Sequence, residues 1–339
     1  MRATLLRRLR NAIGLVAINV AILGLLAGTA EVYLRVTRPY GPCVRTYPGQ
    51  FQNREPLPWA SPDLELGWLS SRSRDDINAQ GFRDRKDFAS VDLLPGRTRI
   101  MMLGDSFVWG VGVSRDQTMA TLLEQTLPGT DVFNLSAAGW SLDQMYLAYL
   151  EYRDTLRPRV VVLAFIDDDV PRVLEAYRVQ EGMNKPSFRV VDGALVRRSP
   201  ADRPSGLAAI AERSAALRCL LREVARVTTA RTITARILRR LAEDTARRGE
   251  RLVAVRIPHN IALTSVLGRL GWQLRGFRSA LEGTGATYLE PLACFAATPG
   301  GADALYLPDA HLTPTGQATL ANCVRHAVID AMNSRMPGE

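Results

Sequence analysis

The stretch IMMLGDS, residues 100–106, joins an apolar run to a small polar triplet and decides the fold. A short, continuous apolar run is typical of a strand that is buried on both faces of a sheet. Gly104 permits a tight turn at the end of such a strand. In a parallel α/β sheet, ligands bind beyond the carboxyl ends of the strands, so we expect Ser106 to face a binding crevice. The alternative is that Ser106 only caps the helix that follows.

Apolar runs alternate with helical patterns along most of the chain after residue 97. The expected strands cover residues 97–103, 131–135, 160–166, 252–257 and 287–292. Helices are expected over 116–127, from a cap at Ser141 to about Leu156, and within the Ala- and Arg-rich residues 206–249. Strands that alternate with helices predict an α/β fold, in which helices cover both faces of a parallel sheet.

The alternation breaks between Pro171 and Pro204, and we interpret residues 171–205 as an insertion. Within it, the stretches 188–191 and 194–197 flank the dipeptide Asp192-Gly193. An Asp-Gly pair between two such stretches predicts a β-hairpin.

The N-terminus has the composition of a membrane anchor. Residues 12–30 form a run of 19 residues without a charge, close to the ~20 that a membrane-spanning helix needs. Four arginines precede the run: Arg2, Arg7, Arg8 and Arg10. Because a basic flank stays in the cytoplasm, we expect a single-pass membrane protein whose main domain is exported. A signal peptide cleaved after Ala30 is the main alternative, and a buried core helix is a weaker one.

Charge and cysteine content exclude several classes of function. The formal net charge is +9, but no nucleic-acid-binding motif and no basic stripe interleaved with aromatic residues accompanies it, so we expect no nucleic-acid partner. The spacing of the four cysteines matches no zinc site, and no metal or cofactor is expected. In an exported domain Cys294 and Cys323 are a candidate disulfide, and four buried free thiols are the alternative. The oligomeric state is left open.

A nucleophilic serine needs a base, and the base needs an orienting group. The chain has three histidines, His259, His311 and His326. His311 lies two residues after Asp309, in a loop before the C-terminal helix, so the carboxylate can hold one nitrogen of the ring. His259 follows an expected strand and ranks second as the base, whereas His326 falls inside a helix and is interpreted as structural.

Three blocks together resemble the SGNH (GDSL) hydrolases, a family of esterases and acyl-group enzymes. They are the Gly-Asp-Ser block, the glycine of NLSAAGW (residues 134–140), and the Asp-Ala-His block at residues 309–311. The resemblance covers residues 97–335 and implies a flavodoxin-like three-layer α/β/α sandwich. It implies that Ser106 is the nucleophile, that Gly139 gives a backbone N–H to the oxyanion hole, and that Asp309 orients the base His311. Gly67-Trp68 and residues 81–84 also look like membrane-anchored bacterial members. This resemblance implies a single-pass protein of the bacterial inner membrane, with the main domain periplasmic or extracellular.

One block departs from this family. Asp168 stands in FIDDDV, residues 165–170, where the family supplies an asparagine to the oxyanion hole beside Ser106 and Gly139. An asparagine amide donates a hydrogen bond to an oxyanion, whereas an ionised carboxylate repels it. The activity therefore depends on whether Asp168 is protonated, turned away, or paired with a positive group of the substrate.

The expected function is a serine esterase that removes O-acyl groups, acetyl in particular, from an envelope or extracellular polysaccharide. Two alternatives are an acyltransferase that uses the same Ser106, Asp309 and His311 on a glycan, and a catalytically inactive glycan-binding envelope protein. The expected organisation is a basic flank and transmembrane anchor over 1–35, a connecting segment over 36–96, and a hydrolase-like domain over 97–339. The sequence does not identify the substrate-binding residues.

Overall fold

The computed structural model describes residues 2–37, 60–88, 96–178, 183–198 and 226–334, with a few single positions between 214 and 224. The described chain divides into two compact units, residues 1–52 with 201–227 and residues 53–200 with 228–339. Cys43 and Cys219, and most of the helices expected over 206–225, lie outside the described residues. The boundaries at residues 35 and 96 that the sequence suggests stay predictions.

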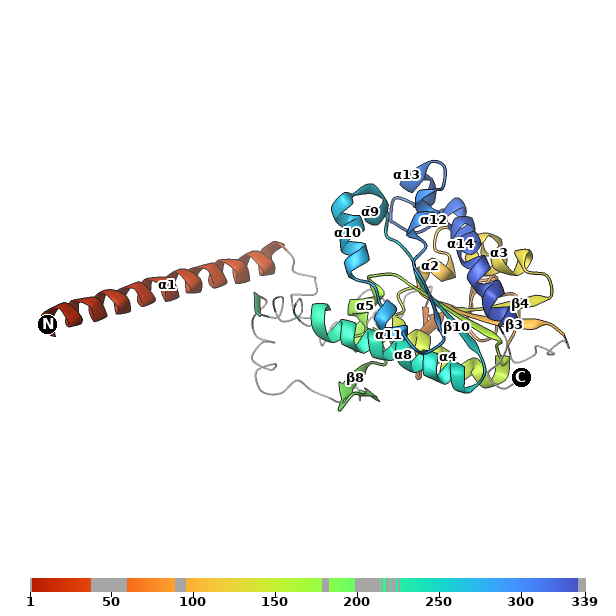
Figure 1. The fold of residues 1–339 in the computed structure, drawn as a ribbon, viewed down its shortest axis with the longest axis horizontal. Coiled ribbons are helices and arrows are strands. Elements are labelled where there is room, and N and C mark those ends of the chain that lie inside the picture. The colour runs from red at the N-terminus through yellow and green to blue at the C-terminus, as the bar shows by residue number, and fades with distance from the viewer. Residues whose placement is uncertain are drawn as a thin grey trace. The chain divides into compact units, whose positions relative to one another are not determined.

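The core of the larger unit is a parallel sheet of five strands (Figure 1). The strands are β3 (Thr98–Gly104), β4 (Thr130–Ser136), β5 (Val160–Phe165), β10 (Arg251–Arg256) and β11 (Thr287–Leu289). Their order across the sheet is β11-β10-β5-β3-β4, and every neighbouring pair is parallel. Counted along the chain this order is 2-1-3-4-5, the flavodoxin-like arrangement. The predicted strands and fold class are confirmed. The last strand, expected to reach residue 292, ends at Leu289 because Pro291 is the N-cap of a helix.

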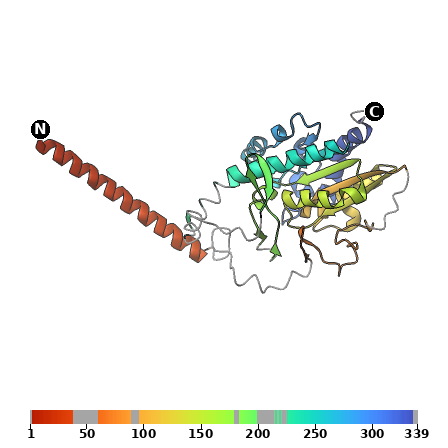
Figure 2. The ribbon, with the colours of Figure 1, turned by 90° about the horizontal axis from the view of Figure 1, so that it is seen from below.

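Helices cover both faces of this sheet (Figures 1 and 2). Two apolar clusters fill the spaces between the layers. Side chains alternate along β3, so Met101 and Leu103 face one cluster while Ile100 and Met102 face the other. The helices on the first face are α4 (Leu142–Leu156), α8 (Arg231–Arg247) and α11 (Arg278–Leu281). Those on the second are α2 (Ser106–Trp109), α3 (Met119–Thr126), α12 (Leu292–Ala296), α13 (Gly301–Leu305) and α14 (Pro314–Asn333).

The smaller elements precede the sheet or connect its strands and helices along the chain. They are β1 (Ala60–Asp63), β2 (Gly67–Ser70), the 3₁₀ helix η1 (Arg115–Gln117), α5 (Asp169–Arg172), β6 (Tyr177–Arg178), β7 (Met183–Asn184), β8 (Phe188–Val191), β9 (Ala194–Arg197), the π-helical turn η2 (Arg226–Ala230), α9 (Asn260–Thr264) and α10 (Val266–Leu274). The predicted hairpin is confirmed, because β8 and β9 pair antiparallel around Asp192 and Gly193. Both turn residues have positive φ, 48° and 79°, as a type I′ turn requires.

Residues 60–88 belong to the core of the larger unit. Trp68 and Phe82 are fully buried and Phe88 is nearly so, all three within the apolar cluster on the α4 side of the sheet. Trp68 Nε1 donates to the carbonyl of Ala138, and Trp140 Nε1 donates to the carbonyl of Trp68, both at 2.9 Å. The segment therefore holds the loop between β4 and α4.

Two features bear on the compartment of the protein. Cys294 and Cys323 form a disulfide, which joins α12 to α14 with the Cα atoms 6.1 Å apart, as proposed from the sequence. Helix α1 (Arg2–Thr37) contains Ile13–Tyr33, the one segment of the described chain that is long and apolar enough to cross a membrane, with a mean hydropathy of 2.2. A signal peptide meets the same criteria, so the anchor and its orientation stay predictions.

Candidate active site

The Gly-Asp-Ser triplet forms the turn from β3 into the short helix α2. Asp105 caps this helix, since its Oδ1 accepts the backbone N–H of Phe107 at 2.9 Å. A Cβ atom on Gly104 would lie 2.2 Å from Val108 Cγ2 and 3.1 Å from the carbonyl oxygen of Ala164. Only glycine therefore lets α2 fold back against the end of the sheet. Ser106 is the first residue of α2 and is 8% exposed, beyond the carboxyl end of β3.

His311 reaches Ser106 from the loop before α14. Its Nε2 lies 3.0 Å from Ser106 Oγ. Asp309 lies on the other side of the ring, with Oδ2 3.1 Å from His311 Nδ1 and Oδ1 accepting the His311 backbone N–H at 3.2 Å. Ala310 between them has a positive φ of 70°, which makes the bend of the loop. The structure thus brings together the three residues that the sequence proposes as a catalytic set.

The carboxyl group of Asp309 is favoured in its charged form. Partial burial alone would raise its pKa, but the His311 backbone N–H and the His311 ring outweigh that effect and lower the pKa of Asp309. An ionised Asp309 suits the role of stabilising a positive imidazole. Its side chain is 60% exposed, so solvent weakens this interaction.

The other two oxyanion candidates follow the strands on either side of β3. Gly104, at the carboxyl end of β3, pairs with Ser136 of β4 and with Ala164 of β5. Ser106, Gly139 and Asp168 therefore all lie within four residues of the carboxyl ends of these three strands. Gly139 has a φ of 81°, a conformation that favours glycine. The oxyanion roles of Ser106, Gly139 and Asp168 stay predictions.

Asp168 has a partner that the sequence does not suggest. Its Oδ2 lies 3.6 Å from Nε2 of His259, which follows β10, and its side chain is 61% exposed. The contact with Asp168 raises the pKa of His259 against the opposing effect of burial, and Asp167 and Asp105 add to the rise. The ring of Phe107 is near both imidazoles, with its centroid 6.4 Å from that of His259 and 5.3 Å from that of His311. His259 is therefore an imidazole of the site region, paired with a carboxylate.

A buried ionic cluster lies behind Ser106. Nη1 of Arg172 is 2.5 Å from Asp169 Oδ1, 3.6 Å from Asp105 Oδ2 and 3.3 Å from the carbonyl of Trp140. One guanidinium thus links the loops that follow β3, β4 and β5. Burial raises the pKa of Asp105, and burial with the nearby Asp105 raises that of Asp169 well above the usual range. Sequence analysis misses this cluster, and the run of three aspartates is the only signal for it.

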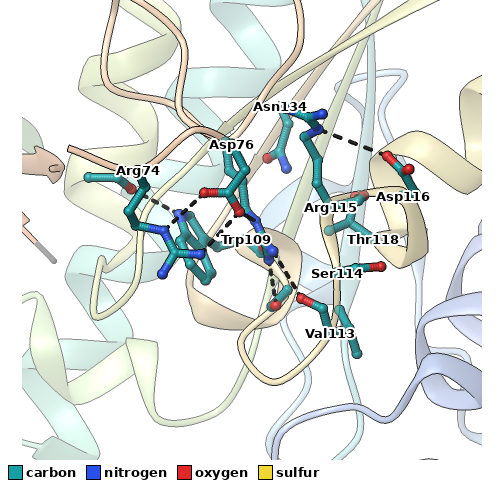
Figure 3. Close-up of polar contacts among 12 residues, drawn as sticks. Arg74, Asp76, Trp109, Val113, Ser114, Arg115, Asp116, Thr118 and Asn134 are labelled. Carbon is teal, nitrogen blue, oxygen red and sulfur yellow. Dashed lines mark hydrogen bonds and ion pairs between the residues drawn. The ribbon is translucent and has the colours of Figure 1, made fainter. Parts of the chain in front are cut away.

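A second arginine, Arg83, holds the other end of α2. It donates to the carbonyls of Trp109, Gly110 and Val113 at 2.7–3.1 Å, and its Nε bonds to Asp76 Oδ2 at 2.7 Å. Burial alone would raise the pKa of Asp76, but Arg74 and Arg83 together lower it to about 2. Figure 3 shows Arg74 and Asp76 beside the Trp109 ring, with Val113 on the loop that follows. The segment before the sheet therefore fixes the helix that carries Ser106.

Replacing Arg83 by methionine is expected to lower kcat of any Ser106-dependent reaction by about 10- to 100-fold with a small change in KM, because a shift of ~1 Å in a reacting group has effects of this size. Steady-state kinetics well below the melting temperature of the variant measure the effect. Arg74→Met is the control, since Arg74 contacts the same Asp76 and the same Trp109 ring but its side chain is 43% exposed. Equal kcat values for the two variants would remove the positioning role of Arg83.

Within the described residues, no group of three or more His, Cys, Asp or Glu side chains is arranged to hold a metal ion. Ser106, His311 and Asp309 can carry out nucleophilic acyl chemistry without one.

No profile of a known protein family matches the chain, and no curated protein sequence matches it. Solved structures of lipolytic proteins and esterases are similar to it. TesA is 12% identical over 69% of this chain and 99% of its own, with a TM-score of 0.45. The acetylxylan esterase Axe2 from Geobacillus stearothermophilus is 13% identical over 71% and 97%, with a TM-score of 0.43. A member of the lipolytic G-D-S-L family from Veillonella parvula DSM 2008 is 10% identical over 68% and 98%, with a TM-score of 0.42. Identities this low concern the fold alone, so the function is argued from the geometry of the site.

Proposed function

We propose that this protein is a serine esterase of the SGNH type that removes O-acyl groups, acetyl in particular, from a polysaccharide. The observation that carries the proposal is the 3.0 Å contact between Ser106 Oγ and His311 Nε2 at the carboxyl end of a parallel sheet. A hydroxyl in reach of an imidazole, with a carboxylate at the second ring nitrogen, is the arrangement that serine acyl chemistry requires.

In this mechanism His311 Nε2 accepts the hydroxyl proton while Ser106 Oγ attacks the carbonyl carbon of the ester. The tetrahedral intermediate collapses, the sugar oxygen leaves with the proton from His311, and the acyl group stays on Ser106. A water molecule then loses a proton to His311 and attacks the acyl carbon. The bond between Ser106 Oγ and the acyl carbon breaks, His311 returns the proton to Ser106 Oγ, and the carboxylic acid leaves. Asp309 orients the imidazole and stabilises its charged form. The backbone N–H groups of Ser106 and Gly139 donate to the oxyanion.

The substrate class and the location form the finer part of the proposal. The apolar segment Ile13–Tyr33 and the arginines before it support a membrane-anchored protein with an exported domain. A polysaccharide is proposed as the acyl carrier because an exported domain would meet the carbohydrate of the envelope, and because the three sequence blocks resemble those of acyl-group enzymes. The anchored, uncleaved form is the one that we propose.

Incubating the purified full chain with an O-acetylated polysaccharide tests this function by measuring acetate in solution. Release of acetate by the wild type supports the esterase. Transfer of acetyl groups to an added glycan acceptor without release of acetate would replace hydrolysis by acyl transfer. Binding of the polysaccharide with neither product would identify an inactive glycan-binding protein. The Ser106→Ala variant is the control in all three cases.

The pair of Asp168 and His259 predicts a pH dependence of its own. Below the raised pKa of His259 the imidazolium offsets the charge of Asp168, and above that pKa the carboxylate faces the oxyanion region uncompensated. We therefore expect kcat of the wild type to fall roughly tenfold at alkaline pH, which corresponds to about 1.4 kcal/mol, because solvent around the largely exposed Asp168 weakens the effect of its charge. Asp168→Asn should lose this decline, as measured by hydrolysis of p-nitrophenyl acetate across pH.

His259→Gln is the matched variant, since it lacks the positive charge at every pH. It should be slow even at mildly acidic pH and lack the alkaline decline. If Asp168→Asn lowers kcat at every pH, the carboxyl group has a positive role in the reaction and the electrostatic interpretation is wrong.

A further inference from the structure

Helices α9 and α10 carry the densest group of exposed large apolar side chains in the described part of the larger unit. The exposed fractions are 56% for Ile261, 84% for Val266, 79% for Leu267, 50% for Leu270 and 75% for Leu274. Elsewhere in the described part of that unit, the exposed large apolar side chains are Leu64, which stands alone, and Val191 and Val196, which belong to the β8–β9 hairpin. An apolar group of this extent on a soluble surface marks a site of contact with another molecule or a membrane.

The two helices form a built surface. Val266, Leu270 and Leu274 repeat every four residues and Leu267 lies beside them, so one side of α10 is apolar. The opposite side of α10 carries Trp272, which is buried. The guanidinium carbon of Arg256 lies 3.6 Å from the centroid of the Trp272 ring and packs on it. A Cβ on Gly268 would lie 2.2 Å from the carbonyl oxygen of Ile261, so the two helices approach as closely as only glycine allows. The apolar side chains are thus presented outward by an anchored element.

The charges around this surface identify its partner. Residues 260–281 contain no acidic residue and three arginines, Arg269, Arg275 and Arg278. Arg269 lies on α10 itself and is exposed. Arg275, which follows α10, is about half exposed and lies 3.6 Å from Asp167. Apolar side chains that enter the acyl region and arginines that reach the headgroups are the features of a helix lying in a membrane interface. Ile13–Tyr33 of the same chain is long and apolar enough to anchor it to a bilayer.

We propose that α9 and α10 dock on the surface of an anionic lipid bilayer. The face is adjacent to the candidate active site, because His259 caps α9 and its ring contacts that of Phe107, the residue after Ser106. Docking would therefore set the rim of the site at the membrane surface. The proposal concerns a contact and does not depend on the esterase activity.

The test places a fluorophore on α10 of the full chain in lipid vesicles. Leu270→Cys, and Leu274→Cys as a second position, are labelled with an environment-sensitive dye without reduction of the native disulfide, and unsubstituted protein gives the background. Leu64→Cys is the control, since Leu64 is 98% exposed on the same unit. Quenching by nitroxide-bearing lipids is compared in phosphatidylglycerol and phosphatidylcholine vesicles.

The expected result is quenching several-fold stronger at residues 270 and 274 than at residue 64 in phosphatidylglycerol vesicles. Arg269→Ala with Arg275→Ala, or 1 M NaCl, where the Debye length is about 3 Å, should weaken it. Equal quenching at residues 64 and 270 would overturn the proposal. So would a blue-shifted dye at residue 270 that lipid nitroxides do not quench, because that result would identify a protein surface, such as a second copy, as the partner.

Discussion

Replacing Ser106 by alanine is expected to lower kcat for ester hydrolysis by about 10⁴- to 10⁶-fold, the range seen when the nucleophile of a serine triad is removed. The reason is the geometry, since Ser106 Oγ is the hydroxyl that lies 3.0 Å from His311 Nε2. A fluorophosphonate probe should label the wild type covalently and leave the variant unlabelled, as measured by mass spectrometry of the intact chain.

Ser114→Ala is the matched control, because Ser114 is an exposed serine on a neighbouring loop, and it should keep full labelling. The circular dichroism spectra of both variants should equal that of the wild type. Equal labelling of the wild type and Ser106→Ala would exclude both the esterase and the acyltransferase, and would leave the glycan-binding alternative.

Replacing Arg172 by methionine is expected to lower the free energy of unfolding by about 3–5 kcal/mol at neutral pH, the cost of leaving a buried charge without its partner. Asp105 and Asp169 have fully buried side chains, and Arg172 contacts both. The pKa of both carboxyls is already raised, so the folded state binds protons more tightly than the unfolded chain. Stability therefore falls as pH rises through the raised pKa values, and the loss in Arg172→Met should be smaller at acidic pH.

Denaturant unfolding at pH 5 and pH 8 measures this difference. The double variant Arg172→Met with Asp169→Asn removes one carboxylate together with the guanidinium, and should recover a large part of the lost stability. A loss in Arg172→Met that does not change with pH, or that the second substitution leaves unchanged, would show that the two carboxylates do not depend on Arg172.

The sequence predicts those parts of the fold that depend on local patterns. Each sheet strand is a short apolar run bounded by turn residues, and four of the five both begin and end within a residue of the expected positions. The turn at Asp192-Gly193 is likewise local, because both residues tolerate a positive φ. Ser106 and His311 could be paired from the sequence because Asp309 lies two residues before His311, and because the blocks around them together resemble those of a known family.

Contacts between distant loops could not be predicted in this way. Arg172 joins Asp105 and Trp140 only because β3, β4 and β5 are neighbours in this register. Asp168 has His259 as a partner, a residue that follows β10 and lies about ninety positions later in the chain, and no local pattern connects the two. Both contacts depend on strand order, which an apolar pattern does not specify, since runs such as VVVLAF fit any central position of a parallel sheet.

Strand β4 lies at the edge of the sheet, and its outer side meets two carboxylates instead of another strand. The backbone N–H of Asn134 donates to Asp84, and that of Val132 donates to Glu124, which also binds Lys86. An uncovered edge of this kind is a template on which chains aggregate. A shortened protein that begins at residue 97 would lack Asp84, Lys86 and the buried Trp68 and Phe82, and we expect it to form insoluble aggregates. The smallest chain that stays soluble should begin near residue 60, before the first strand that packs on this core.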